Sequence, residues 1–399
     1  MHVRLVLFAA GAVYATPIIA QTGGLSRSDA VQAAIERGAR LGVARADTAV
    51  ANAGLISARA RPNPGLSASY SKSVPNYHVG VDIPIDFPWL RQMRVRAAEF
   101  GLQAAQLRYQ LVRATAALDA DTTYTRAIAA RERLALSRRN SLDADSLLRM
   151  VIRRRDAGDA SDMDVELARV SAGREENVAA GDSLTWISAL LDLQATLGMS
   201  ADRLEIQATD SLVAPPDAPV PGRTLGEVAA GLSLESATLN AKLQHRSFWS
   251  SPSVSLGFEF KDPDQPGLLP TFGVGIGLPL FDRNRGPIAQ AEAERARATA
   301  EVTLAQIEAR NQIAHALRER ESALARVARD RQVVTSATRV VAMSLTAYRE
   351  GASSLSNVLE AQRTARDLLA QYIDDLASAW IATAELRVLA IVPSSNPQP

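Results

Sequence analysis

The chain of 399 residues contains no cysteine. This absence excludes disulfides, thiolate metal ligands, cysteine nucleophiles and an acylated N-terminal cysteine anchor. Aromatic residues make up only 5% of the chain, which is low for a conventional globular core. A chain rich in small and charged residues, with few aromatics, suits long helices packed closely side by side.

The chain also lacks an excess of charge, because 44 Lys and Arg face 43 Asp and Glu, for a net charge of +1. No nucleic acid or other polyanion is therefore predicted as a partner. The four histidines are scattered, and His315 with Glu319 suggests a surface pair on one helix face rather than a metal site. No glycine-rich phosphate loop follows a strand, and no nucleophile–base set stands out. The sequence thus predicts no enzyme, no cofactor and no metal site.

Long apolar runs are absent after the first 20 residues. The best later run, Ile381 to Val392, is interrupted by Glu385 and Arg387. Residues 1–20 have the layout of a secretory signal, with cleavage after Ala20. The alternative, an N-terminal membrane anchor, needs a longer apolar run of roughly 20 residues. We therefore expect an exported protein without a helical span.

The chain does contain an internal repeat: its two halves share the same order of predicted elements. Each half predicts a modest helix, a strand pair, a very long helix, a tight turn and a return helix. The long helices, at roughly 65 residues and about 1.5 Å per residue, are rods on the order of 100 Å. Val327, Val334, Val341 and Tyr348 recur every seventh residue, which indicates a coiled-coil seam. The predicted organisation is a signal (1–20), a first repeat (21–200), a proline-rich connector (201–223), a second repeat (224–392) and a C-terminal tail (393–399).

The two tight turns share one pattern. In each, a glycine can take the left-handed conformation that closes a helix, and a serine three residues later can cap the next helix. Asp164 follows Ser161 by three residues, which approximates a capping box. The pattern predicts two helical hairpins, with turns at Gly158, Asp159, Ala160 and Ser161 and at Gly351, Ala352, Ser353 and Ser354.

The strand segments alternate apolar residues with small or polar ones, as in SVSLGFEF (253–260). This period fits a half-buried soluble sheet or a membrane β-barrel. No other segment offers a core for a soluble sheet to cover. Four strands cannot close a barrel, so several chains would share one: a dimer gives about eight strands and a trimer about twelve. Small residues on the inner face favour the wider barrel, which leaves a hole.

Each strand pair passes into a long helix through a proline, Pro84 or Pro279. Proline ends a strand ladder, and the charged and polar residues that follow Pro279 suit a water interface. Both helices flanking each strand pair then lie on one side of the membrane, the periplasm. Besides the two prolines, the predicted strand-to-helix junction comprises Asp282, Arg283, Asn284, Arg285 and Gly286.

These segments resemble the TolC family of outer-membrane efflux ducts. The similarity lies in LPLFDRNRGPIAQAEAE (278–294), RPNPGLSASY (61–70), RRRDAGDASDMDVELAR (153–169) and YREGASSLSNVLEAQR (348–363). The resemblance implies a mostly α fold of coiled-coil hairpins with four strands per protomer. It also implies a homotrimer whose roughly twelve-stranded barrel lies in outer-membrane lipid and continues into a periplasmic α-helical tunnel. Such a duct is the passive exit channel of a tripartite system, joined by a periplasmic adaptor (membrane fusion) protein to an inner-membrane pump such as an RND transporter.

The resemblance also assigns roles at the hairpin tips. It places Asp164, Asn357 and Glu360 at the periplasmic gate and makes the tip residues the adaptor contacts. Asn357 stands where the best-known members have an acid, and Ser353 where they have an arginine, so the closing bonds differ. The plainer interpretations are helix N-terminal stabilisation by the carboxylates and simple turns at the tips.

A second hypothesis is a soluble periplasmic coiled-coil scaffold or adaptor whose strands form a small β-domain. Within the duct hypothesis the cargo stays open between metal ions, drugs or solvents, and proteins. The run Pro62-Asn63-Pro64 resembles the cation-efflux branch of the family.

Overall fold

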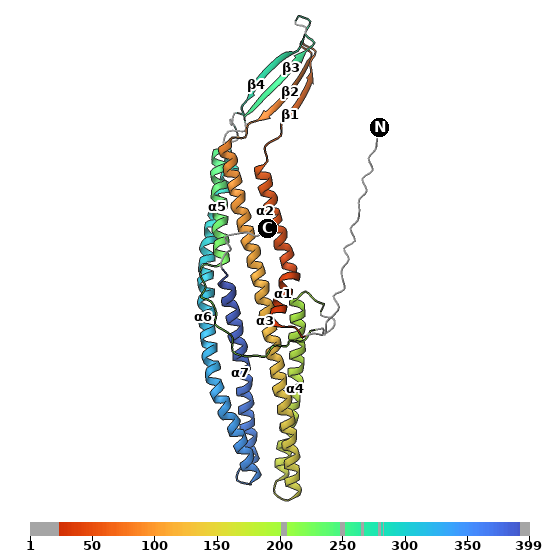
Figure 1. Ribbon diagram of the computed structural model, residues 1–399, viewed down its shortest axis with the longest axis vertical. Helices are drawn as coiled ribbons and strands as arrows, with labels where there is room; N and C mark the ends of the chain where they lie inside the picture. The colour runs from red at the N-terminus through yellow and green to blue at the C-terminus, as the bar shows by residue number, and fades with distance from the viewer. Residues whose placement is uncertain are drawn as a thin grey trace, which may run out of the picture.

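The computed structural model describes residues 24–200, 206–247, 252–264, 267–277, 281 and 283–391. It is a long rod with a sheet at one end (Figure 1). At the other end, one tight turn joins α3 to α4 and another joins α6 to α7. The predicted signal (1–20) and tail (393–399), and the junction residues Pro279 and Asp282, lie outside the described residues.

Helices form the rod, and two of them run nearly its whole length. α3, with 69 residues, is about 100 Å long at ~1.5 Å per residue. α3 packs along α4, α6 packs along α7, and α3 also contacts α2, α5 and α7. In the described part of the chain, no helix is both long and apolar enough to cross a membrane. The helices are α1 (Arg27–Arg37), α2 (Ala39–Arg59), α3 (Pro88–Asp156), α4 (Asp162–Thr196), α5 (Leu225–Arg246), α6 (Arg285–Arg349) and α7 (Leu355–Leu389).

Alanine accounts for much of the helix packing. Along α6, the buried residues Ala291, Ala298, Ala309, Ala316 and Ala323 are spaced by seven or eleven positions. Both spacings return to one face of a helix after whole turns. Because alanine is small, the neighbouring helix can approach closely along this line. The core of the rod therefore needs few aromatic side chains.

The predicted seam of α6 is present. Val327 and Tyr348 are buried, and Val334 and Val341 are partly buried. The modest helix expected at the start of the first repeat, over residues 26–60, was predicted as one helix, and this prediction is wrong. The chain forms α1 and α2 instead, because Gly38 adopts an extended ψ of 121° between them. Glycine is a poor helix former, so a break there costs little.

One antiparallel sheet combines the strands of both halves. Its order is β1-β2-β3-β4, so the two predicted strand pairs join where β2 meets β3. β4 ends at Gly275, and residues 278–280 lie outside the described residues. The strands are β1 (Gly65–Tyr70), β2 (Tyr77–Pro84), β3 (Ser253–Phe260) and β4 (Leu269–Gly275).

The strand register separates an apolar face from a polar face across the whole sheet. One apolar row runs through Leu66, Val81, Leu256 and Phe272, which are successive cross-strand partners. The apolar face is uncovered in the single chain, where Phe272 is 82% exposed. Such a contiguous exposed apolar face marks a surface that is covered by lipid or by another protein.

Candidate functional site: the hairpin tips and the sheet

Both hairpin turns close their first helix in the same way. After α3, the amide of Gly158 donates to the Arg155 carbonyl at 2.9 Å, and the amide of Asp159 donates to the Arg154 carbonyl at 2.8 Å. After α6, the amides of Gly351 and Ala352 repeat this pair of hydrogen bonds. The two glycines have φ values of +83° and +76°. This left-handed geometry explains why each turn needs glycine at that position.

The second helix of each hairpin begins differently. Ser161 and Asp164 form a complete capping box, in which each side chain accepts a hydrogen bond from the other residue's amide at 3.1 Å. Ser354 occupies the same place before α7, but its hydroxyl lies 2.8 Å from the Ser356 hydroxyl and caps no amide. Asn357 donates instead to the Ser353 hydroxyl at 3.1 Å. The α7 tip is therefore the less tightly capped of the two.

An apolar cluster joins the two hairpins near the tips, and Arg154 reinforces it. The Arg154 side chain donates to the backbone carbonyl of Tyr348 and lies 4.7 Å from the centre of its ring. The cluster comprises Leu147, Val151, Val165, Ala168, Tyr348, Leu355 and Val358. The sequence by itself did not predict this contact. It gave no signal for Arg154, because the partner lies 194 positions away.

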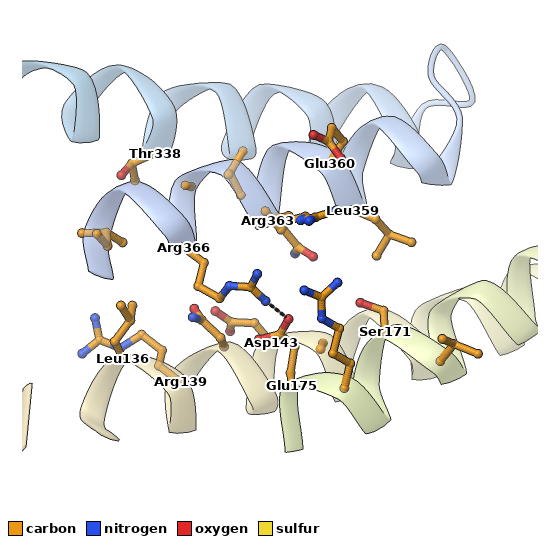
Figure 2. A pocket seen from close by; sticks show the side chains of 18 of the residues that line it. Leu136, Arg139, Asp143, Ser171, Glu175, Thr338, Leu359, Glu360, Arg363 and Arg366 are labelled. Atoms are coloured by element: carbon orange, nitrogen blue, oxygen red, sulfur yellow. Dashed lines mark hydrogen bonds and ion pairs between the residues drawn. The ribbon is translucent and has the colours of Figure 1, made fainter. Parts of the chain in front are cut away.

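A hollow of about 500 Å³ lies above the tips, between α3 and α4 on one side and α6 and α7 on the other. Figure 2 shows that an ion pair crosses it, from Arg366 of α7 to Glu175 of α4. Both side chains are only 12% exposed. The second Glu175 oxygen and the amide nitrogen of Asn140 are buried without a hydrogen-bond partner among the described residues. The two hairpins are thus joined at the tip and again across the hollow.

The three residues assigned to the gate do not form one cluster within the chain. Asp164 is occupied in its capping box, Asn357 donates to the Ser353 hydroxyl, and Glu360 lines the hollow. In the described chain, no hydrogen bond or ion pair joins one of them to another. A gate built from them would need contacts between protomers, so the assignment stays a prediction.

The strand-to-helix junctions are tied to the neighbouring helices. Pro84 is the last residue of β2, and Arg94 then joins Asp86 at 2.9 Å and the Ala58 carbonyl of α2 at 3.0 Å. In the second half, Asn284 has a φ of +58° and donates to the Gln244 carbonyl of α5 at 2.9 Å. Arg283 precedes it, Arg285 is the first residue of α6, and Gly286 follows within the helix. Both junctions therefore fix the start of a long helix against the helix that precedes the strands.

Two carboxyl groups meet in the seam between α6 and α7. Asp375 is buried and accepts from Arg326 at 2.7 Å and from Gln371 at 3.2 Å. One oxygen of Asp330 is buried beside it with no partner among the described residues. Burial raises the pKa of Asp330, and the neighbouring Asp375 carboxyl raises it further. Burial opposes ionisation of Asp375 too, but the hydrogen bonds from Arg326 and Gln371 lower its pKa.

We expect Asp330→Asn to stabilise the protein at pH 8 and to leave it unchanged at pH 3. A carboxyl whose pKa is raised on folding contributes stability below its unfolded pKa and loses that stability as the pH rises through the folded pKa. The asparagine side chain of the variant does not ionise, so the variant does not lose stability as the pH rises. Thermal unfolding at the two pH values checks the difference, with the exposed Asp145→Asn as control. An equal effect of Asp330→Asn at both pH values would contradict the assignment.

Aromatic side chains mark both ends of the sheet. At the end far from the helices, the Tyr77 ring lies 5.2 Å from both the Tyr70 and the Phe260 ring. At the helix end, Phe87 stacks on Trp89 at 4.6 Å. β2 separates the two groups with eight residues, or about 26 Å. Membrane strands carry an apolar band of about this height between two aromatic girdles.

Comparison with known proteins agrees with this architecture. The profile of the family described as "Outer membrane efflux protein" matches residues 30–199 and 230–390. The cobalt-zinc-cadmium resistance protein CzcC of Cupriavidus metallidurans is 25% identical over 344 residues, covering 84% of this chain and 82% of that protein. A membrane protein from Pseudomonas aeruginosa has a similar structure, with a TM-score of 0.78, 20% identity, and coverage of 91% and 93% of the two chains. The outer membrane protein VceC of Vibrio cholerae has a TM-score of 0.77 at 18% identity, with coverage of 91% and 96%.

The chain belongs to the outer membrane efflux protein family. It is therefore an outer-membrane channel of an efflux system, with its helical rod in the periplasm, rather than a soluble scaffold or adaptor. The resemblance of the sequence to the TolC family and the expected mostly α fold with four strands are confirmed. No group of three or more His, Asp or Glu side chains that could hold a metal ion occurs among the described residues.

Proposed function

We propose that the protein is the passive exit duct of a tripartite exporter and works as a homotrimer. The observation that carries this proposal is the sheet: it has four strands, two uncovered edges and one exposed apolar face. Open edges are not stable in lipid, because their backbone groups have no partners. Three copies joined edge to edge make a closed barrel of about twelve strands, and their helices make a tunnel below it. A duct of this kind needs no catalytic residue and no cofactor.

Membrane fractionation followed by native mass measurement of the detergent-solubilised protein tests this proposal. The experiment uses the full chain expressed with its own N-terminus. An outer-membrane species of three chains is expected. A soluble protein or a stable monomer from a folded preparation would overturn the proposal.

We further propose that the hairpin tips contact the periplasmic adaptor and that Asp164, Asn357 and Glu360 shape the gate behind them. Small residues at the tips support the contact, because they allow another helical hairpin to approach closely. Gly158 and Gly351 are required by the turns themselves, so substitutions there cannot isolate the contact. Ala352 is exposed and lacks this constraint, which makes it the better test position.

We expect Ala352→Trp to reduce export at least tenfold while the trimer persists, because the indole blocks close approach at the tip. Ten-fold corresponds to about 1.4 kcal/mol of lost adaptor affinity. Export by whole cells and native mass are the measurements. Val220→Trp, at an 86% exposed position of the connector, is the control. Full export by Ala352→Trp would remove the α6–α7 tip from the adaptor contact.

For the cargo, we propose metal cations, driven by an inner-membrane pump such as an RND transporter. The similarity to the cobalt-zinc-cadmium resistance protein CzcC over most of both chains supports this choice. Cells lacking the protein should lose resistance to cobalt, zinc and cadmium and regain it when the gene is restored. Loss of resistance to organic drugs alone would favour a drug duct instead.

A further inference from the structure

A second hollow, of about 770 Å³, lies part of the way along the rod, where α7 ends and α5 begins. α5 and α7 follow each other along the rod, and each packs against both α3 and α6 (Figure 1). Because two helices meet end to end here, their side chains leave a space that a continuous helix would fill. Residues of all four helices line this space. Its volume is within the range of small-molecule sites, about 300–1,000 Å³.

The walls of the hollow are mainly apolar and reachable from solvent. Leu111 of α3 is 37% exposed, and Val388 of α7 is only partly buried. A concave apolar wall of this kind favours the apolar part of a ligand, because binding removes both surfaces from water. Apolar side chains come from all four helices: Leu111, Leu118, Leu225, Ala305, Ala309 and Val388.

The charges at the hollow are of one sign. Lysine and arginine are absent from its described lining, although the whole chain has 44 of them against 43 acidic residues. Glu227 is held in the capping box that begins α5, and His315 pairs with Glu319 at 3.3 Å. Glu308 and Glu385 line the hollow without a hydrogen bond or ion pair to any described residue. The hollow therefore has two carboxylates with no cationic partner.

Glu385 has the most to gain from a bound cation. It is partly buried, and burial raises its pKa; the Glu319 carboxylate raises the pKa further, while His315 opposes the shift. Glu385 also lies near the C-terminal end of α7, where the helix dipole places partial negative charge. Arg387 is close in sequence, but its guanidinium lies 5.7 Å from the Trp380 ring and does not line the hollow. A cation beside Glu385 would offset both its burial and the dipole.

We propose that this hollow binds an amphiphilic organic cation, with its cationic nitrogen beside Glu308 and Glu385 and its apolar body against the leucine and alanine side chains. A metal ion is a poorer match, because hard cations need several oxygen ligands and these walls are apolar. Among the described residues, no group of three or more acidic or histidine side chains could hold such an ion. One chain supplies all four helices, so the inference depends neither on the trimer nor on the metal cargo proposed above.

Fluorescence titration of the full-length protein in a neutral detergent tests the proposal, with ethidium as the probe. Ethidium is an aromatic monocation, and anilinonaphthalene sulfonate is an aromatic anion that serves as the control probe. We expect Glu308→Gln combined with Glu385→Gln to weaken ethidium binding about tenfold, because both carboxylates lose their charge. The control pair, Glu176→Gln with Glu321→Gln, removes the same charge from exposed positions outside the hollow.

A second variant, Ala305→Trp, keeps both carboxylates and fills the hollow from α6. Ethidium binding should fall at least tenfold, while helical circular dichroism and native mass stay unchanged. Weaker ethidium binding in both hollow variants, with full binding in the control pair and weak binding of the anion, would support the inference.

Two results would overturn the inference and leave the duct in place. One is a folded parent protein that binds no ethidium, or that binds it no more tightly than the double glutamine variant does. The other is an assembled protein that excludes ethidium while the dissociated chain binds it, because the hollow would then be a contact between protomers.

Discussion

Leu256→Arg is expected to abolish assembly of the duct in the outer membrane. Leu256 lies in the middle of β3, on the apolar face between Val81 and Phe272. An arginine at the middle of a lipid-facing strand costs about 2–4 kcal/mol. Three copies raise the cost to roughly 6–12 kcal/mol per trimer, which is comparable to the whole stability of a typical domain. Outer-membrane yield and native mass are the measurements.

The adjacent residue provides a matched control. Ser255 precedes Leu256 on the same strand but belongs to the polar face, opposite Asp82 and Gly273. Ser255→Arg adds the same side chain at the same depth, yet directs it into water. We expect the trimer to persist in this variant. Equal loss of trimer in both variants would mean that the two faces of the sheet do not meet different solvents.

The second large effect is expected at Arg27, which holds the beginning of α1 against the rod. Its guanidinium pairs with the buried Asp121, donates to the Thr125 hydroxyl at 2.8 Å and lies 3.9 Å from the Trp380 ring. Its amide donates to Asp210 at 2.9 Å. One residue thereby joins the N-terminal segment, α3, the connector and α7.

Arg27→Ala should lower the free energy of unfolding by about 3–5 kcal/mol per protomer, because it leaves the Asp121 carboxylate buried and uncompensated. Urea unfolding of the solubilised protein, followed by helical circular dichroism, is the measurement. Arg40→Ala is the control, since its pair with Asp119 is 84% and 48% exposed and is worth less than about 1 kcal/mol. Similar losses in the two variants would show that burial of the Arg27 pair has no energetic consequence.

A double variant separates lost charge pairing from lost packing. Replacing a buried ion pair with apolar residues of similar size is often neutral or stabilising. Arg27→Met combined with Asp121→Leu should therefore recover most of the stability lost in Arg27→Ala. If the double variant stays as unstable as Arg27→Ala, the hydrogen bond to Thr125 and the contact with Trp380 carry the effect instead.

The sequence by itself determined the local elements of this protein. Seven-residue recurrence predicted the α6 seam, strict alternation predicted the strands, and the paired glycine and serine positions predicted both hairpin turns. These features are set by neighbours within about one or two turns of backbone, so a single chain segment carries the information. The expected single helix at the start of the first repeat was wrong, because Gly38 separates α1 from α2.

Only the tertiary structure decided which distant residues meet. The joining of β2 to β3, the contact of Arg154 with Tyr348, the Arg366–Glu175 pair and the attachment of Arg27 to Asp121 all connect positions far apart in the chain. The helices contain many arginines, and a sequence does not show which of them are buried, so the partners of Arg27, Arg154 and Arg366 could not be predicted from it. Helix packing selected the partners by bringing particular faces together and excluding water from them, and this selection required the whole chain to fold.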